Sequence, residues 1–404
     1  MLRLRGVYLV ALLAACGRLG FDALPNASDG GDGASVDGSG DGGSGAPPTV
    51  RSRNTADVAP AGLTNPANQA DGTHLVFVDD TPGKNQDLVI FQVGDDAATL
   101  SAYVSADGGL TWVHQVLSPP NASGINGMGG CQDSVNHAFH LSWLDTSVSD
   151  QYARYAPTYD GSGDITGFTL QASFGFFDEG GDSPGSRDLA EVVDGAGKHR
   201  VVFRGSGRST GAGGLFKRAM TSSAAGLTPA SQTDWVPATN AAGTGGTDDL
   251  LLPNDYATAD DPTTFMSGVS SNVAGGAGEP IIVLAGFPAD GTLLAWIVSP
   301  GSGGDFSIGS AQLSQHFGAG DGVRANASLS VASAPSGEVW IAYTEAASSP
   351  LPGVHVAMVD AGGLHVEAVP QPATAAADRH AVIAAGPSSQ LVAMWPDGAA
   401  TIDA

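Results

Sequence analysis

The arginines of this sequence are few and gathered together, which makes them the clearest candidates for binding chemistry. Seven of the chain's 16 lysines and arginines lie between Arg187 and Arg218, in a chain with 41 acidic residues. A guanidinium group binds a carboxylate or a sulfate through two parallel hydrogen bonds. We therefore predict an anion-binding site formed by Arg200, Arg204, Arg208 and Arg218. The alternative is that these arginines form ion pairs with acidic residues close to them in the sequence. The large number of such acids favours this alternative.

A second group of charged residues could bind calcium. Asp255, Asp260 and Asp261 form an acidic segment, and carboxylates are ligands that calcium prefers. They are weak candidates, because a solvated loop explains the same residues. Asp160 and Asp164 are spaced like the start of a calcium loop, but the bidentate acid that such a loop needs later is absent. No other cofactor is expected.

The histidines and cysteines show no spacing typical of a metal site. His137 and His140 are three residues apart on an expected strand, so their side chains should point to opposite faces. Cys131 lies in an apolar region and is expected to be a buried small side chain. We therefore predict no transition-metal site.

The elements that must position these residues are β-hairpins, and the clearest is centred on Ser105-Ala-Asp-Gly-Gly-Leu-Thr-Trp112. Alternating runs flank this segment, as expected of two strands joined by a turn. Asp107 can accept hydrogen bonds from backbone amides of the turn, and the two glycines after it allow positive φ. Trp112 adds a large apolar ring beneath the turn.

The order of Ser105, Asp107, Gly109, Thr111 and Trp112 resembles the Asp-box (BNR) hairpin of sialidase-like β-propellers. The resemblance covers one hairpin and implies a fold rather than an activity. Sialidases also carry an Arg-Ile-Pro segment in the first blade, which this sequence lacks. No sialidase catalytic residue is therefore transferred to this chain, and its catalytic residues remain unknown.

The amino-terminal residues resemble a bacterial lipoprotein signal. A basic start and a short apolar run lead to Leu13-Ala-Ala-Cys16, so residues 1–15 are predicted to be a signal peptide and Cys16 to be lipidated. An ordinary signal peptide is the alternative. Gly17 follows the cysteine, and the absence of aspartate there favours the outer membrane, on its periplasmic side or at the cell surface.

Residues 16–48 are predicted to be a disordered linker. Its Gly/Asp/Ser-rich segment 25–48 contains no aromatic residue and a single valine, too little apolar surface to offset the entropy of ordering. The net charge of the whole chain is −25, which excludes nucleic acid as a partner and favours neutral or cationic ligands.

Short strands separated by glycine-containing turns recur from residue 49 to residue 404. We interpret them as four-stranded units near 70–118, 129–175, 187–233, 255–314 and 325–369, with a last unit at 378–404 closed by a strand near 49–57. This spacing is typical of propeller blades. The predicted fold is all-β, a single β-propeller of six or seven blades, with a pair of β-sandwiches as the alternative.

Three functions are compatible with such a fold. The first is a non-enzymatic, lipid-anchored monomer that binds a glycan or another surface polymer, with Trp112, Trp143 and Trp235 as stacking platforms or as core residues. The second is a sialidase-like glycoside hydrolase, and the third is a protein-binding scaffold. We favour carbohydrate binding without catalysis. Acids converging on the propeller mouth would favour the enzyme.

Overall fold

The computed structural model describes 23 segments of the chain. They are residues 4–10, 55–58, 74–93, 98–109, 111–117, 125–133, 136–145, 150–177, 189–193, 199–204, 216–222, 229–237, 249–251, 265–270, 281–287, 292–300, 306–317, 328–334, 339–345, 353–360, 363–368, 382–386 and 391–394. In several strands only the backbone is described. All statements about the structure concern these residues.

The described strands form six antiparallel sheets, named I to VI. Sheet I contains β3 (His74–Val78), β4 (Leu88–Val93), β5 (Leu100–Ser105) and β6 (Val113–Leu117). Sheet II contains β7 (Ile125–Asp133), β8 (Ala138–Asp145), β9 (Asp150–Tyr159) and β10 (Ile165–Phe177). Sheet III contains β11 (Leu189–Val193), β12 (His199–Arg204), β13 (Phe216–Ser222) and β14 (Trp235–Pro237), with β15 (Asp249–Leu251) also paired to β13.

The other three sheets repeat this plan. Sheet IV contains β16 (Phe265–Ser270), β17 (Ile281–Phe287), β18 (Thr292–Pro300) and β19 (Phe306–Phe317). Sheet V contains β20 (Ser328–Ser333), β21 (Val339–Glu345), β22 (Gly353–Asp360) and β23 (Gly363–Ala368). Sheet VI has the order β24 (Val382–Ala385), β25 (Leu391–Met394), β1 (Leu4–Val10) and β2 (Thr55–Val58).

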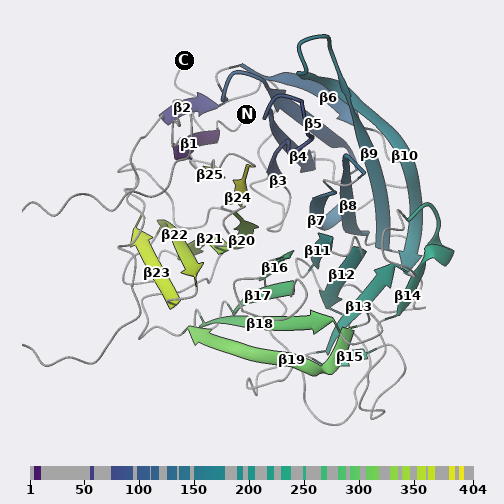
Figure 1. Ribbon diagram of the computed structural model, residues 1–404, viewed down its shortest axis with the longest axis vertical. Coiled ribbons are helices and arrows are strands. Elements are labelled where there is room, and N and C mark those ends of the chain that lie inside the picture. The colour runs from purple at the N-terminus through teal and green to yellow at the C-terminus, as the bar shows by residue number, and fades with distance from the viewer. Residues whose placement is uncertain are drawn as a thin grey trace, which may run out of the picture.

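The first strand of each sheet lies in an inner ring. Strands β3, β7, β11, β16, β20 and β24 contact one another in that order, and β24 contacts β3 again. Figure 1 shows these strands around the centre, with later strands of each sheet towards the rim. The molecule is therefore strand-rich and propeller-like. The one helical element among the described residues is η1 (Gln232–Asp234), and no described helix is long and apolar enough to cross a membrane.

Burial in sheet I is highest in the two middle strands and falls towards the outer edge, which explains the strand sequences. Every residue of β4 and β5 is buried, whereas β6 is mostly exposed. A middle strand of a sheet is covered on both faces by the neighbouring sheets. It therefore requires apolar residues at successive positions rather than at alternate ones. The run Leu-Val-Ile-Phe of β4 meets that requirement.

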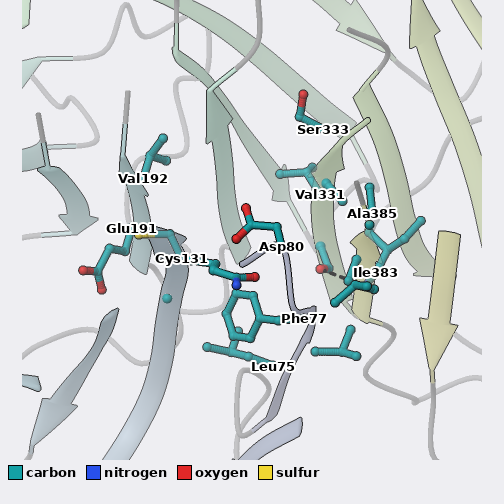
Figure 2. A pocket seen from close by; sticks show the side chains of 18 of the residues that line it. Leu75, Phe77, Asp80, Cys131, Glu191, Val192, Val331, Ser333, Ile383 and Ala385 are labelled. Carbon is teal, nitrogen blue, oxygen red and sulfur yellow. Dashed lines mark hydrogen bonds between the residues drawn. The ribbon is translucent and has the colours of Figure 1, made fainter. Parts of the chain in front are cut away.

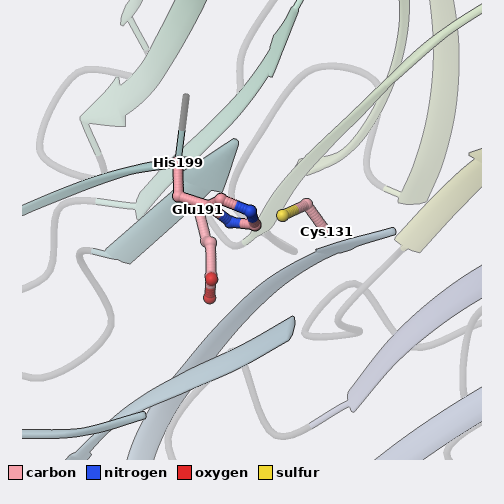
Figure 3. A group of neighbouring side chains, drawn as sticks. All are labelled: Cys131, Glu191 and His199. Atoms are coloured by element: carbon pink, nitrogen blue, oxygen red, sulfur yellow. The ribbon is translucent and has the colours of Figure 1, made fainter. Parts of the chain in front are cut away.

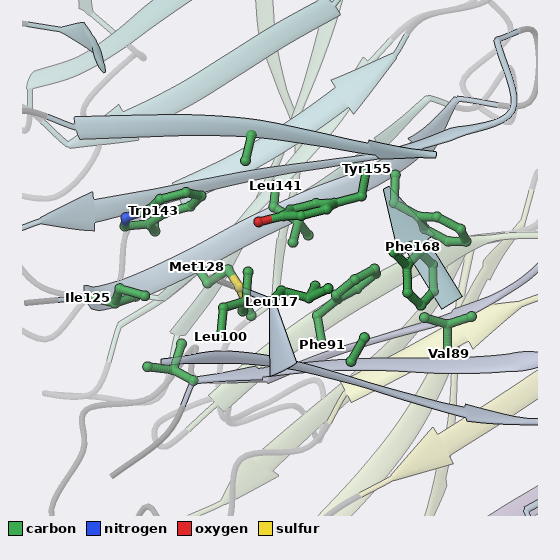
Figure 4. Close-up of a cluster of buried hydrophobic side chains, with 14 of the residues drawn as sticks. Val89, Phe91, Leu100, Leu117, Ile125, Met128, Leu141, Trp143, Tyr155 and Phe168 are labelled. Atoms are coloured by element: carbon green, nitrogen blue, oxygen red, sulfur yellow. The ribbon is translucent and has the colours of Figure 1, made fainter. Parts of the chain in front are cut away.

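Apolar clusters join adjacent sheets. The largest lies between sheets I and II (Figure 4) and includes Phe91, Phe139, Tyr155 and Phe168. Phe91 lies 5.5 Å from Phe139 and 5.3 Å from Phe168, measured between ring centroids. Smaller clusters join sheet VI to sheet I and sheet V to sheet VI. These three clusters give the described residues an apolar core that runs through sheets V, VI, I and II.

Sheet VI brings together the two ends of the chain. The expected closing strand near 49–57 corresponds to β2, but β2 does not pair with β25 directly. Strand β1 lies between them, pairing Leu4 with Val58 and Val7 with Met394. The residues of β1 lie within the signal peptide that the sequence predicts. Cleavage of that peptide stays a prediction.

Candidate functional site

A cavity of about 430 Å³ lies among the inner strands. Its described lining comes from β3, β7, β11, β20 and β24 and the residues beside them, so the inner strands of five sheets contribute. Apolar side chains such as Leu75, Phe77, Val331 and Ile383 (Figure 2) and polar groups contribute about equally to its walls. No lysine or arginine is among the described lining residues. The cavity can therefore hold a small or terminal group with an apolar face.

Asp80 provides a carboxyl group in this cavity. It lies two residues beyond the end of β3, and Figure 2 shows its side chain among the lining residues. Its Oδ1 atom is buried and makes no hydrogen bond. Burial, followed by the nearby Asp79 carboxylate, raises the pKa of Asp80 to about 6. Asp80 can accept hydrogen bonds from a ligand, or donate one when protonated.

A hydrogen-bond network beside the cavity holds the neighbouring Asp79. Asp79 Oδ1 accepts hydrogen bonds from the Thr81 amide at 3.1 Å and from Gln132 Nε2 at 2.9 Å. Asp79 Oδ2 accepts one from the Tyr159 hydroxyl at 3.0 Å. Asp79 is thus engaged by protein groups on both oxygens, whereas Asp80 Oδ1 is buried without a hydrogen bond in the protein.

A second group of polar residues is buried between sheets II and III. Cys131 and Asp133 are two residues apart on β7, so they share one face of sheet II. His140 is the cross-strand partner of Cys131 and lies on the same face. Strands β11 and β12 of sheet III contribute Glu191 and His199 from the opposite side. These five residues form the polar cluster, and they meet because side chains alternate between the two faces of each strand in two adjacent sheets. Figure 3 draws three of them, Cys131, Glu191 and His199.

The distances in the polar cluster centre on one carboxylate oxygen. Asp133 Oδ2 lies 3.6 Å from His140 Nε2 and 3.4 Å from His199 Nε2. Asn136 donates to Asp133 from its amide at 3.1 Å and from its side chain at 2.6 Å. His140 Nδ1 lies 2.5 Å from the Tyr152 hydroxyl.

The pKa values in the polar cluster depart from their usual ranges. Burial alone would raise the pKa of Asp133, but interactions with His140, His199 and Asn136 outweigh it and lower that pKa well below the usual range. Burial lowers the pKa of His140 to about 3. Burial raises the pKa of Glu191 to about 8, although Ser142 donates a 2.6 Å hydrogen bond to its Oε2. At neutral pH the cluster therefore combines an ionised Asp133 with a neutral His140 imidazole.

Two sets of donors in the polar cluster are close enough to hold a metal ion. The first is Asp133, His140 and His199, and the second is Cys131, Glu191 and His199. Within each set the donor atoms lie within 4.8 Å of one another. Cys131, expected to be a buried small side chain, is only partly buried and lines the cavity beside Glu191. Burial, then Glu191, raises the pKa of its thiol.

The hairpin predicted around Asp107 is confirmed, because β5 pairs with β6 on either side of it. Asp107 Oδ1 accepts hydrogen bonds from the Thr111 amide and from Ser105 Oγ, both at 2.8 Å. Trp112 Nε1 donates to the Gly109 carbonyl at 3.1 Å. Gly108 and Gly109 have φ values of 73° and 96°, which a side chain would disfavour. These residues form a structural turn and do not line the cavity.

The other predicted site residues are placed as follows. Arg200 and Arg204 lie on β12 and Arg218 on β13, but their side chains and all of Arg208 are outside the described residues. Asp255, Asp260, Asp261 and Cys16 are also outside them. These predictions are therefore neither supported nor contradicted by the structure.

The structure describes the surroundings of the tryptophans and of Asp160. Trp143 and Trp235 are buried, so they are core residues rather than stacking platforms. Trp112 is partly buried and packs beside the cluster between sheets VI and I. The Asp160 carboxylate accepts hydrogen bonds from the amides of Ser162, Gly163 and Asp164, as a hairpin turn requires.

Sequence reasoning missed Asp80 and the polar cluster. Sequence reasoning placed His137 and His140 on one strand, but His137 lies in an exposed turn before β8 and His140 is buried on β8. That reasoning did not consider His199, which is distant in sequence and is brought close by the packing of sheet III on sheet II. The sequence signal that could have indicated the cluster is the alternation of polar residues on two paired strands. Cys131 and Asp133 alternate on one strand, and His140 and Ser142 alternate on its partner.

Comparison with known proteins supports the fold. The sequence matches no protein-family model and no curated protein sequence. The crystal structure of AofleA from Arthrobotrys oligospora aligns with a TM-score of 0.51 at 14% identity, covering 81% of this chain and 79% of that chain. A thermostable family-43 glycoside hydrolase aligns with a TM-score of 0.41 at 12% identity, over 76% of this chain and 97% of that chain. The first likeness shows a shared fold alone, and the second is too low to carry an argument.

Proposed function

We propose that this chain is a six-bladed, lipid-anchored propeller that binds a glycan or a related surface polymer without catalysis. The observation that carries the proposal is the axial cavity with the Asp80 carboxyl on its wall. Its volume of about 430 Å³ falls within the range of about 300–1,000 Å³ typical of small-ligand sites.

The chemistry of the cavity suits a sugar residue. Sugar hydroxyls can donate hydrogen bonds to the Asp80 carboxylate, which lies among the lining residues. The C–H face of a sugar ring can pack on an apolar wall such as that of Leu75, Phe77 and Ile383. The acidic chain and the absence of described cationic lining residues favour a neutral or amino-bearing glycan over an acidic one.

Binding is favoured over hydrolysis because glycosidases use two carboxyl groups that flank the scissile bond, about 5–5.5 Å or 6.5–9.5 Å apart. The other described acid of the lining is Glu191. Its carboxylate accepts the hydrogen bond of Ser142 and is directed away from Asp80 in Figure 2. The described part of the cavity thus supplies one directed carboxyl group rather than a flanking pair.

The lipid anchor belongs to the same proposal. Cys16 would carry the lipid, and residues 16–48 would hold the propeller away from the outer membrane. Signal-peptide cleavage would remove β1, so sheet VI of the mature chain would have to pair β25 with another strand. Replacement of Cys16 by alanine should move the protein from the membrane fraction to the soluble fraction. Retention in the membrane fraction would contradict the anchor.

The binding proposal is tested with the Cys16→Ala chain on a glycan array, followed by calorimetric titration of the best ligand. We expect Asp80→Asn to weaken binding about tenfold, the effect of losing a charge-assisted hydrogen bond of about 1.5 kcal/mol. Asp160→Asn is the matched control and should bind like the unsubstituted chain. The turn donates its hydrogen bonds to Asp160 Oδ1, and asparagine keeps an oxygen at that position.

Two results would contradict the binding proposal: no bound glycan, or equal affinity of the Asp80→Asn and unsubstituted chains. Release of shorter sugars during incubation would instead support the glycoside hydrolase.

A further inference from the structure

We propose that Asp133, His140 and His199 bind one divalent transition-metal ion between sheets II and III, and that zinc is the ion that this donor set suits. This site is distinct from the proposed glycan site, because none of its three ligands lines the cavity. Two imidazoles and one carboxylate form a known type of ligand set for such ions.

The spacing of the donor atoms carries the proposal. His140 Nε2 and His199 Nε2 lie 3.6 and 3.4 Å from the same atom, Asp133 Oδ2. An N–H···O hydrogen bond spans about 2.7–3.2 Å, so both separations are long for one. Ligands about 2.0–2.1 Å from a tetrahedral zinc ion are separated by about 3.4 Å. The observed separations therefore match the edges of a coordination shell.

The surrounding residues orient these donors in the way that metal ligands are commonly oriented. The Tyr152 hydroxyl lies 2.5 Å from His140 Nδ1, which leaves Nε2 to face Asp133. His140 Nε2 is fully buried and makes no hydrogen bond. Two hydrogen bonds from Asn136 hold the Asp133 carboxylate. Outer partners of this kind set the ring orientation and the tautomer of ligating histidines.

Burial and access also fit an ion. The three side chains are 0–1% exposed, and a buried carboxylate is stable only when it is paired, hydrogen-bonded or bound to a metal. Cys131 and Glu191, the other members of the polar cluster, line the cavity and lie close to His199. They provide further donors and place the site beside a route for ion entry.

The experiment measures metal in the purified full chain, before and after chelation and re-addition of Zn²⁺. We expect about one transition-metal ion per chain. His140→Asn and His199→Asn should each weaken Zn²⁺ binding at least tenfold in competition with a chromophoric chelator. His137→Asn is the matched control, because His137 is exposed and its φ of 52° suits asparagine. It should bind Zn²⁺ like the unsubstituted chain.

A second measurement on the unsubstituted chain keeps the proposal testable if the variants do not fold. Chelation should lower the Tm and Zn²⁺ should restore it, since an ion that binds only the folded state stabilises it. Co²⁺ added to the chelated chain should give the visible absorption of a tetrahedral site. Zinc or iron bound in a His140-dependent manner would support the site. Absence of bound transition metal, or binding that His140→Asn leaves unchanged, would overturn it.

Discussion

The two faces of sheet II meet their neighbours through opposite chemistry. The interface with sheet I is apolar and aromatic, with Phe91 of sheet I against Phe139 and Phe168 of sheet II. The interface with sheet III contains the polar cluster, including His140 and Glu191. Both interfaces are buried. Apolar contacts therefore predominate on one side of this four-stranded sheet, and a polar cluster lies on the other.

Strand β8 shows how one sequence produces both faces. Phe139, Leu141 and Trp143 alternate with His140 and Ser142 along the strand. In a two-layer fold such alternation marks a core face and a solvated face. In a ring of sheets both faces of an inner strand are covered, so the polar residues are buried as well. The comparison teaches that a polar face in such a fold can be an internal site.

The two interfaces should differ in their effect on stability. Apolar burial is non-directional and stabilises in proportion to the area removed from water. A buried polar network adds stability only where each group has its partner, but it responds to protons and ions. We therefore expect the first interface to hold the sheets together and the second to carry chemistry.

The largest effect is expected from Phe91→Ala, which removes a central ring of the apolar interface. Loss of this ring should lower the free energy of unfolding by about 3–5 kcal/mol, because transfer and cavity terms add. Chemical denaturation measures the change. Val113→Ala on the exposed strand β6 is the control and should cost about 1 kcal/mol at most. Equal losses in both variants would show that the first interface is not the main core.

A smaller effect is expected from Ser142→Ala in the polar interface. This change removes the 2.6 Å hydrogen bond to Glu191 Oε2 and leaves a buried carboxyl group without that donor. The free energy of unfolding should fall by about 1–3 kcal/mol. Ser173→Ala is the control, because Ser173 Oγ is buried without a hydrogen bond and its loss should be neutral or stabilising. Indistinguishable unfolding curves would argue against a role for the Ser142–Glu191 bond.

The smallest effect is confined to a pH window and concerns a polar group at the apolar interface. Asp87 Oδ2 accepts a 2.6 Å hydrogen bond from the Ile165 amide of sheet II. Burial raises the pKa of Asp87 from 3.8 to about 6, and the Ile165 bond offsets this only in part. The folded chain therefore binds the Asp87 proton more tightly than the unfolded chain does. This proton binding stabilises the folded state below pH 3.8, and the stabilisation is lost as the pH rises to about 6.

Unfolding of the Asp87→Asn variant from pH 3.5 to 7 tests this sign. Relative to the variant, the unsubstituted chain should lose stability as the pH rises through the window. A difference in stability that stays constant across this range, or grows with pH, would contradict the raised pKa. The Asp87→Asn variant itself reports the pH dependence of the rest of the molecule.

Much of the architecture could be predicted because it depends on local order. The Asp107 hairpin follows from residue types that accept turn hydrogen bonds and tolerate positive φ, and its hydrogen bonds join residues at most four apart. The described sheets also follow the expected sequence units, since each sheet joins consecutive strands. The exception is sheet VI, where β1 and β2 come from the other end of the chain. The repeat predicted a closing strand near 49–57, but no local pattern indicates that β1 lies between β2 and β25.

By itself the sequence determined the strand-rich chain, its turns and the alternation of side chains along β7 and β8, because these depend on neighbours a few residues away. Only the tertiary structure decided which sheet covers which face. Asp133 and His140 are near in sequence, but His199 approaches them only because sheet III packs on sheet II. Asp80 likewise acquires its surroundings from strands of sheets II, III, V and VI. The physical reason is that backbone alternation selects a face locally, whereas the partner of that face is selected by packing around the whole ring.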